Sequence, residues 1–263
     1  EPVEQRLHSS SVSSPHTIPG VPFDIGAHFD EVAARYTELR SDDYSDRITD
    51  FVARFADLER LRVLDVGCGT GRVAGRLASV FGVNAVGVDR SAAMIAEARR
   101  DHGAVARFEI GDVEQLPFDA AEFDAVLARM MVHLVARPVA FVEISRILRP
   151  GGRVVVSTAD PERMGDLWLV AYFPSFVAID AARFPTVDGL QAELAAAGFT
   201  DLTVHRFVTR RRYTREQALA KIRGRAFSTF ALIDDAEFAA GLARAEAELP
   251  ELVEYDSTLV NVR

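Results

Sequence analysis

The sequence predicts an α/β protein with a doubly wound, mainly parallel sheet of seven strands and a small helical insertion. Short runs rich in β-branched residues recur along the chain, and stretches with helical spacing of their apolar residues follow them. Continuously apolar runs of this length are typical of strands that are buried on both faces of a parallel sheet. The predicted strands are 62–66, 85–88, 106–110, 123–128, 153–158, 200–208 and 257–262.

The first 58 residues precede this alternation. Residues 1–22 are rich in serine and proline and lack apolar periodicity, so we expect a mobile tail there. Residues 23–58 show helical spacing in two runs, so we expect N-terminal helices. Their apolar faces consist of Phe29, Val32, Ala33 and Tyr36 in the first run, and of Ile48, Phe51, Val52 and Phe55 in the second.

Helix signals connect the strands of the predicted core, which spans 59–208. Ser91 can cap the helix that follows the second strand. Asp160 and Pro161 supply a cap and a residue suited to the first helical position, and Thr186 opens a helix that Gly198 closes. Repeated strand–helix units with short connections indicate a single domain over 23–263.

The alternation breaks after the sixth strand. Thr214 with Gln217, and Asp234 with Glu237, have the spacing of a capping box ahead of a helical run. We therefore expect the helical insertion, which could act as a lid, at 209–250. A closing strand then follows within 251–263.

Composition limits the partners and the compartment. The chain has 30 Lys and Arg residues against 39 Asp and Glu residues, a net charge of −9, which disfavours nucleic acid as the main partner. A single cysteine, Cys68, cannot form an internal disulfide, which favours a reducing, cytoplasmic compartment. No apolar stretch reaches the about 20 residues that a membrane span needs, so we expect no membrane partner.

A glycine-rich turn follows the first predicted strand. Residues 67–71 read Gly-Cys-Gly-Thr-Gly. Gly67 and Gly69 allow a tight turn at the carboxyl end of the strand and let a ligand approach the bare backbone. The alternative is that these glycines serve only the packing of a strand against a helix.

Three carboxylates lie at corresponding places along the next strands. Asp65 precedes the glycine turn, Asp89 ends the second strand and Asp112 follows the third. Carboxyl ends of parallel strands share one edge of the sheet, so we expect the three to line one site. An ionised carboxylate only accepts hydrogen bonds, which suits an ammonium group, vicinal hydroxyls or an exocyclic amine. The alternative is solvated aspartates at strand ends.

Two features argue against a dinucleotide at this site. The dinucleotide fingerprint needs a third glycine three residues after the second, and that position is Arg72. Asp65 would also place a negative charge beside a pyrophosphate. A cationic or zwitterionic ligand therefore fits better than NAD.

Four segments in order resemble motifs of class I S-adenosylmethionine-dependent methyltransferases. Residues 63–71 resemble the first motif, and residues 86–91 with Met94 resemble the second. Residues 111–118 resemble the GDxExLPF segment of the small-molecule branch related to quinone-biosynthesis (UbiE-like) enzymes, and residues 144–152 resemble the segment that leads into the fifth strand. The close resemblance covers about 60–160.

The resemblance implies a Rossmann-like fold, with S-adenosylmethionine as cofactor and S-adenosylhomocysteine as product. Its methionine part would contact Asp65, Arg129 and the backbone of Gly67, Cys68 and Gly69. Asp89 would hold the ribose hydroxyls and Asp112 the adenine amine, with Arg90, Met94 and Val113 packed against the adenosine. Tyr36 would cover the cofactor, unless it is a core tyrosine. We interpret Cys68 as a backbone contact, not as a nucleophile.

The acceptor side is predicted from the residues that follow the fourth and fifth strands. His133 is a candidate general base, because an imidazole suits proton removal at neutral pH; alternatively it only braces its loop. Trp168, Tyr172 and Phe176 have helical spacing and could line an apolar acceptor pocket. Otherwise they form core or a dimer face. The other histidines are scattered, so we expect no metal.

The resulting hypothesis is methyl transfer to the O, N or C atom of a small molecule by in-line displacement, driven mainly by positioning. A nucleic-acid or protein methyltransferase is the alternative, although residues 128–131 lack the Asn/Asp-Pro-Pro-aromatic segment of many amino-methylating enzymes. A protein that binds S-adenosylmethionine or NAD without catalysis also stays open, as does a homodimer.

Basic residues concentrate between Arg206 and Arg225. This segment has eight basic residues and one acidic residue, Glu216, a net charge of +7. We interpret it as a solvated helix face, or as a cationic lid that steers an anionic acceptor.

Overall fold

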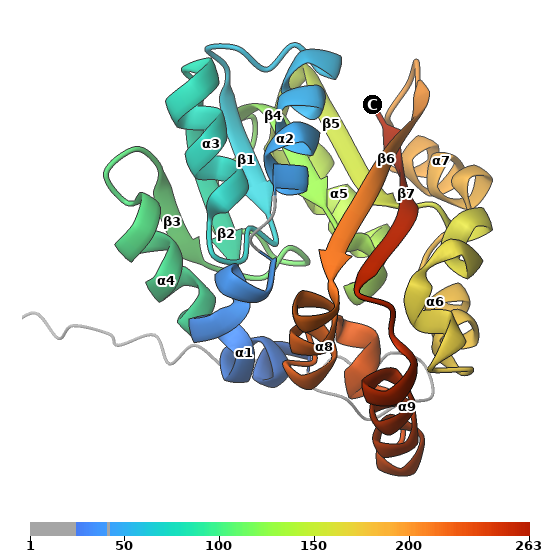
Figure 1. The fold of residues 1–263 in the computed structure, drawn as a ribbon. Helices are drawn as coiled ribbons and strands as arrows, with labels where there is room; N and C mark the ends of the chain where they lie inside the picture. The colour runs from blue at the N-terminus through green and yellow to red at the C-terminus, as the bar shows by residue number, and fades with distance from the viewer. Residues whose placement is uncertain (1–24, 41–42) are drawn as a thin grey trace, which may run out of the picture.

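The computed structural model describes residues 25–40 and 43–263, so the predicted tail at 1–22 lies outside the described residues. Its seven-stranded sheet has the order β3-β2-β1-β4-β5-β7-β6, and β7 is antiparallel to both of its neighbours (Figure 1). The predicted doubly wound, mainly parallel sheet is confirmed. The strands are β1 (Arg62–Val66), β2 (Asn84–Asp89), β3 (Arg107–Ile110), β4 (Phe123–Arg129), β5 (Leu148–Ala159), β6 (Val204–Thr214) and β7 (Leu252–Val262).

Helices cover both faces of this sheet. The α-helices are α1 (Ile25–Arg40), α2 (Asp43–Phe55), α3 (Arg72–Phe81), α4 (Ala92–His102), α5 (Arg137–Ile147), α6 (Phe176–Arg183), α7 (Val187–Ala196), α8 (Arg215–Arg223) and α9 (Asp235–Glu248). Single 3₁₀ turns form η1 (Val132–Leu134), η2 (Pro161–Asp166), η3 (Trp168–Ala171) and η4 (Ser228–Ala231). No helix of this described part has the length and apolar character needed to cross a membrane.

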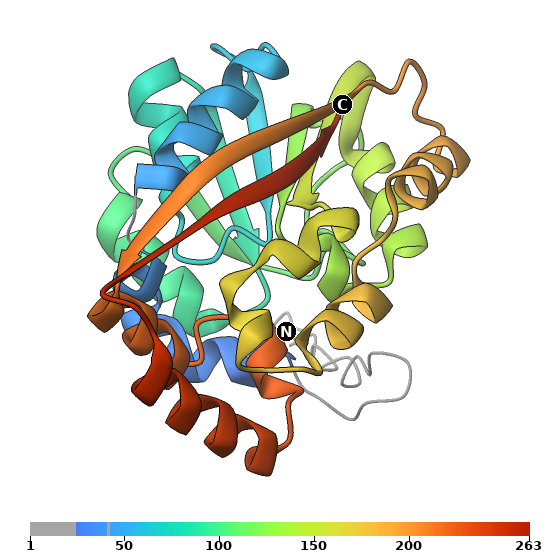
Figure 2. The same ribbon diagram turned by 45° about the vertical axis from the view of Figure 1, so that its right-hand side comes forward.

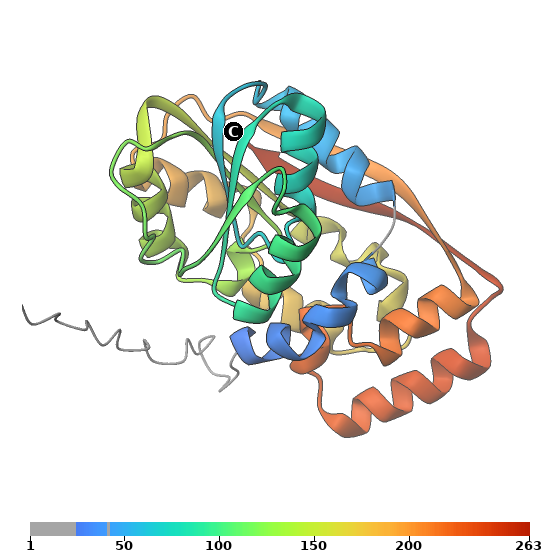
Figure 3. The same ribbon diagram turned by 90° about the vertical axis from the view of Figure 1, so that its left-hand side faces the viewer.

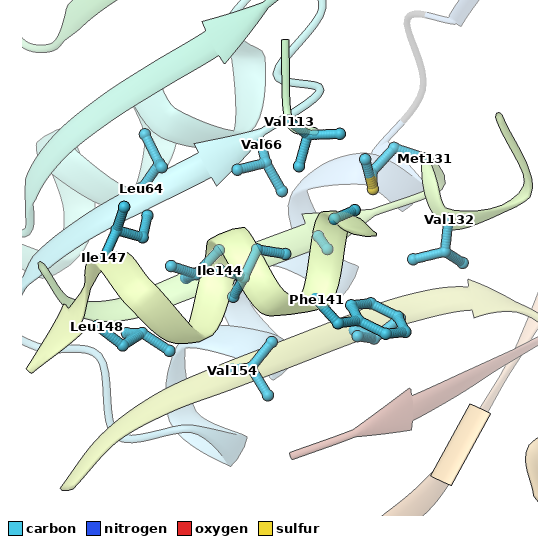
Figure 4. Packing of buried hydrophobic residues seen from close by; sticks show 14 of the residues in the cluster. Leu64, Val66, Val113, Met131, Val132, Phe141, Ile144, Ile147, Leu148 and Val154 are labelled. Carbon is cyan, nitrogen blue, oxygen red and sulfur yellow. The ribbon is translucent and has the colours of Figure 1, made fainter. Parts of the chain in front are cut away.

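The strand period of two divides the core into two layers. Val63 belongs to the cluster formed with α2, α3 and α4, whereas its neighbour Leu64 belongs to the cluster formed with α5 and α7. Figure 4 shows this second layer, in which Ile144 and Phe141 of α5 pack in one cluster with Leu64. Burial on both faces explains why the central strands read as continuous apolar runs.

The predicted helix caps form as side-chain hydrogen bonds. Ser91 Oγ accepts from Met94 N (3.0 Å), and Thr186 Oγ1 accepts from Gly189 N (3.1 Å). Thr214 forms a complete capping box with Gln217 at the start of α8.

The last two strands are longer than the sequence predicts. They pair along their whole length, from Val204↔Val262 to Thr214↔Leu252. The pairing between β5 and β7 reaches only Ala159↔Leu259. The antiparallel pair of β6 and β7, which we call the hairpin, therefore extends past the carboxyl end of β5 (Figure 2). The helices of the insertion therefore begin at Arg215. Figure 3 shows α8 and α9 beyond the ends of β6 and β7, with α1 on the same side of the sheet.

Candidate active site

The glycine turn brings the backbone of β1 against the end of β2. Gly67 N and Cys68 N both donate to Val88 O, at 2.8 and 3.1 Å. Gly67 has φ +66°, and a Cβ there would lie 2.9 Å from Met131 Cβ. Only glycine accommodates this conformation and this close approach at low cost. The turn therefore leaves bare backbone at the carboxyl edge, immediately before α3.

The structure brings the three predicted aspartates together around one cavity of about 350 Å³. Asp89 Oδ2 accepts from Gly69 N and its Oδ1 accepts from Ser91 N, both at 2.9 Å. Asp112 Oδ1 accepts from Glu114 N at 2.9 Å. These bonds fix the carboxylates relative to the turn.

Asp65 is the deeply buried carboxylate of the site, with 3% of its surface exposed. Burial, with a contribution from the charge of Asp89, raises the pKa of Asp65 to about 7, although Arg129 opposes the shift. Its Oδ2 atom is buried and has no hydrogen-bond partner within the described residues. A buried carboxylate oxygen without a donor fits a ligand that brings one, such as an ammonium group.

The other predicted cofactor residues border the same cavity. Burial also raises the pKa of the Cys68 thiol well above its usual value, and the charges of Asp65 and Asp89 add to this effect. A protonated thiol is a poor nucleophile, which agrees with our interpretation of Cys68. The bordering residues are Tyr36, Gly67, Cys68, Gly69, Arg90, Met94, Val113 and Arg129.

Helix α1 borders this cavity through two aromatic side chains. Phe29 and Tyr36 line it and contact each other edge to face, with ring centroids 6.0 Å apart. Between them on α1, Asp30 Oδ1 accepts a 2.5 Å hydrogen bond from Ser91 Oγ at the cap of α4. The side chain of Asp30 thus joins α1 to the N-terminal end of α4, close to Asp89 and Met94 in the sequence.

Arg129 ends β4, and His133 lies just after this strand in η1. Arg129 Nη1 donates to Ser45 Oγ of α2 at 3.0 Å. His133 is 7% exposed, lines the cavity and stacks on Phe184, with ring centroids 4.0 Å apart and an interplanar angle of 12°. A histidine that only braces its loop would make such a stack. A general base would need the contact with the cavity that His133 also has.

The predicted acceptor aromatics separate in the structure. All three pack in the cluster of α8, α9 and the ends of β6 and β7 that adjoin them, but only Phe176 also lines the cavity. Pro174 breaks the helical spacing on which the prediction rested, because proline has no backbone N–H to continue a helix. Trp168 therefore opens η3, Tyr172 follows its last residue, and Phe176 opens α6. This placement favours the core interpretation of Trp168 and Tyr172.

Sequence reasoning missed most of the acceptor side. The spacing of Phe176, Asp180 and Phe184 was a readable signal, because residues four apart share a helix face. No local signal could reveal the hairpin and η4 residues, since they reach the cavity only through the pairing of β6 with β7 and the packing of the insertion. The unpredicted lining residues include Asp180, Phe184, Arg211, Tyr213, Thr229 and Tyr255.

The basic segment does not form one helix face. Its strand residues lie on β6, where Arg210 pairs with Asp256 and Arg212 with Glu254 across the hairpin. Arg206 pairs with Asp160. Acidic side chains from other segments thus offset much of the local charge.

Within the described residues, no group of three or more His, Cys, Asp or Glu side chains is placed to hold a metal ion.

Comparisons with known proteins agree with this architecture. A family model described as a methyltransferase domain matches residues 63–152. The demethylmenaquinone methyltransferase of Clavibacter sepedonicus is 30% identical over 215 residues, which cover 72% of this chain and 86% of that protein. For the curated relatives that match first, however, the chain spans only between 22% and 58% of their length.

Solved structures share the fold at low identity. A protein of Anabaena variabilis, assigned as a methyltransferase of an antibiotic biosynthesis pathway, has a TM-score of 0.67 at 21% identity, covering 82% of this chain and 96% of that one. Phosphoethanolamine N-methyltransferase 2 of Haemonchus contortus, in complex with S-adenosylmethionine, has a TM-score of 0.58 at 20% identity, covering 89% and 56%. The motifs of this chain, its sheet order and its match to 86% of the Clavibacter sepedonicus protein together show the family. The chain belongs to the class I S-adenosylmethionine-dependent methyltransferases.

Proposed function

We propose that this protein transfers the methyl group of S-adenosylmethionine to a small-molecule acceptor, at an O, N or C atom, and releases S-adenosylhomocysteine. The observation that carries the proposal is one cavity with two different ends. The glycine turn borders one end, with Asp65, Asp89 and Asp112, and the other end is bordered by His133, Phe176 and Phe184. Such a cavity can hold a cofactor and an acceptor side by side.

The residues around the turn fit this cofactor. Asp65 Oδ2, buried without a donor, would accept from the amino group of the methionine part. Asp89 would hold the ribose hydroxyls and Asp112 the adenine amine, because both carboxylates border the cavity on the side of β2 and β3. Arg90, Met94 and Val113 would pack against the adenosine, and Tyr36 would cover it. Arg129 and the backbone of Gly67, Cys68 and Gly69 would complete the methionine site.

Positioning supplies most of the acceleration in this proposal. The bound cofactor supplies a methyl group made electrophilic by its positive sulfur. The protein then has to hold the acceptor in line with that methyl and exclude water, which can contribute several kcal/mol. His133 either removes a proton from the acceptor or braces Phe184, with which it stacks.

The size of the cavity favours a small acceptor over nucleic acid or a protein. Its volume of about 350 Å³ lies at the lower end of the range of small-molecule sites. The net charge of −9 also disfavours a phosphate backbone.

Calorimetry with S-adenosylmethionine, S-adenosylhomocysteine and NAD tests the cofactor. We expect the first two to bind and NAD not to bind. Asp65→Asn should weaken both, whereas Asp188→Asn, at an exposed carboxylate of α7, should leave their affinities unchanged. Tight binding of NAD alone would refute the proposal. Transfer of labelled methyl to a panel of phenols, amines and carboxylic acids then tests the reaction itself.

A further inference from the structure

The acceptor side of the cavity has a carboxylate set between two aromatic rings. Phe176, Asp180 and Phe184 recur every four residues along α6 and its C-terminal end, and all three line the cavity. Phe184 stacks on His133, and Phe176 contacts Phe227 edge to face, with centroids 6.2 Å apart. Asp180 is therefore the polar group of an otherwise aromatic stripe.

Both hydrogen bonds that described residues donate to the carboxylate of Asp180 fall on one oxygen. Arg183 Nη2 and Thr229 Oγ1 donate to Oδ1, the latter at 2.7 Å. An ionised carboxylate can accept about four hydrogen bonds, so Oδ2 retains its full capacity. The side chain is 11% exposed and borders the cavity, which makes Oδ2 the oxygen available to a bound molecule.

The partners of Asp180 hold it firmly in place. The Arg183 side chain is only 2% exposed, and its Nη2 also donates to Thr229 Oγ1 at 2.9 Å. The pKa of Asp180 is raised from its usual value by burial, although the charge of Arg183 and the two hydrogen bonds oppose this shift. Arg183 thus offsets the charge of the carboxylate from the side away from Oδ2. Such a fixed oxygen selects ligands by hydrogen bonding and by charge.

We propose that Asp180 determines acceptor specificity: its Oδ2 accepts a hydrogen bond from a hydroxyl or amino group of an acceptor whose apolar body packs against Phe176 and Phe184. This inference rests on the proposed function, because it assigns the acceptor end of the same cavity. A carboxylate acceptor is disfavoured, since its negative charge would meet Asp180 in a partly desolvated site. Arg211, buried on β6 and also lining the cavity, is the residue that would favour such an acceptor instead.

Three probes with one apolar body separate these possibilities. We would titrate para-butylphenol, para-butylbenzylamine and para-butylbenzoate into the full chain saturated with S-adenosylhomocysteine, and measure each Kd by calorimetry. The phenol and the protonated amine should bind at least about tenfold more tightly than the benzoate, a difference of about 1.4 kcal/mol. This ranking needs no variant.

Variants then assign the ranking to Asp180. Asp180→Asn should weaken the amine about tenfold and strengthen the benzoate, because it keeps the shape and removes the charge. Thr229→Val, which removes one bond to Oδ1, should shift the same ranking less. Asp188→Asn is the matched control and should change nothing. The Kd of S-adenosylhomocysteine should stay unchanged in every variant, which verifies the fold and the cofactor site.

Several outcomes would overturn the inference. They are preference of the wild type for the benzoate, binding of none of the three probes, or an unchanged ranking in Asp180→Asn. Failure of S-adenosylhomocysteine to bind would instead refute the proposed function, so the two failures are distinguishable.

Discussion

In the proposed binding mode, the protonation of Asp65 would depend on whether the cofactor is bound. With a pKa of about 7 in the ligand-free protein, this carboxyl is about half protonated at neutral pH. An ammonium group placed against it favours the charged form, so binding should release a proton. We expect the affinity for S-adenosylmethionine to rise by up to about tenfold per pH unit below pH 7 and to level off above it. Calorimetry in two buffers of different ionisation enthalpy measures the released proton.

The raised pKa of Asp65 also determines how the free energy of unfolding changes with pH. The folded-state pKa of Asp65 lies above its usual value of 3.8, so the native protein holds this proton up to higher pH than the unfolded chain. Its contribution to the free energy of unfolding should therefore fall as pH rises from about 4 to about 7. Asp65→Asn should abolish both the proton release and this pH dependence. A wild type that binds S-adenosylmethionine without releasing a proton would contradict the coupling.

His133 can be tested without disturbing its stack. His133→Phe keeps an aromatic ring against Phe184 but cannot take a proton. Because the close stack is a bracing contact, we expect kcat to stay within a few-fold of the wild type. His133→Ala, which removes the ring, should lower the thermal midpoint. Loss of about 10²–10⁴-fold in kcat with His133→Phe, at unchanged stability, would identify the imidazole as the base instead.

At the scale of elements, the position of α1 depends on its attachment to α4. Asp30→Ala removes the acceptor of the Ser91 hydrogen bond and should cost about 1 kcal/mol of stability. Because Phe29 and Tyr36 line the cavity from the same helix, the Kd of S-adenosylhomocysteine should rise several-fold. Chemical denaturation and calorimetry provide the two measurements.

The matched control for this change is Glu31→Ala, at the exposed neighbour of Asp30. It should alter neither quantity. Equal effects of the two substitutions would mean that helix α1 does not depend on the bond to Ser91 for its place.

At the scale of the whole molecule, pairing across segments offsets the local excess of positive charge. The net charge of +7 between Arg206 and Arg225 counts one stretch of sequence, but the acids that pair with it belong to β7, to α9 and to the start of η2 with its cap. We therefore expect little long-range steering. The KM of a transferred acceptor should change by less than about twofold between about 0.1 M and about 1 M salt, although the Debye length falls from about 10 to about 3 Å.

A steep increase of KM with salt, abolished by Arg211→Glu, would instead support a cationic lid. The control is the affinity of the wild type for S-adenosylhomocysteine at each salt concentration, because it reports any general effect of salt on the cavity.

Prediction from sequence succeeded where the signal was local. Strand β1 has the predicted bounds because its apolar run and the following Gly67 are neighbours in the chain. It was less accurate at β6, which extends to Thr214 through three consecutive arginines, because the partner that stabilises those residues lies on β7. Trp168 and Tyr172 show the same limit: their spacing was helical, but Pro174 and the packing of the insertion decided where they lie.

The sequence by itself determined the cofactor side of this protein. Asp65, Asp89 and Asp112 each lie at or just after a strand end, and parallel strands present their carboxyl ends at one edge, so strand polarity alone brings them together. Only the tertiary structure decided the acceptor side. Asp180, Thr229 and Tyr213 come from a helix, a 3₁₀ turn and a strand that meet at the cavity through long-range packing, which no local pattern records.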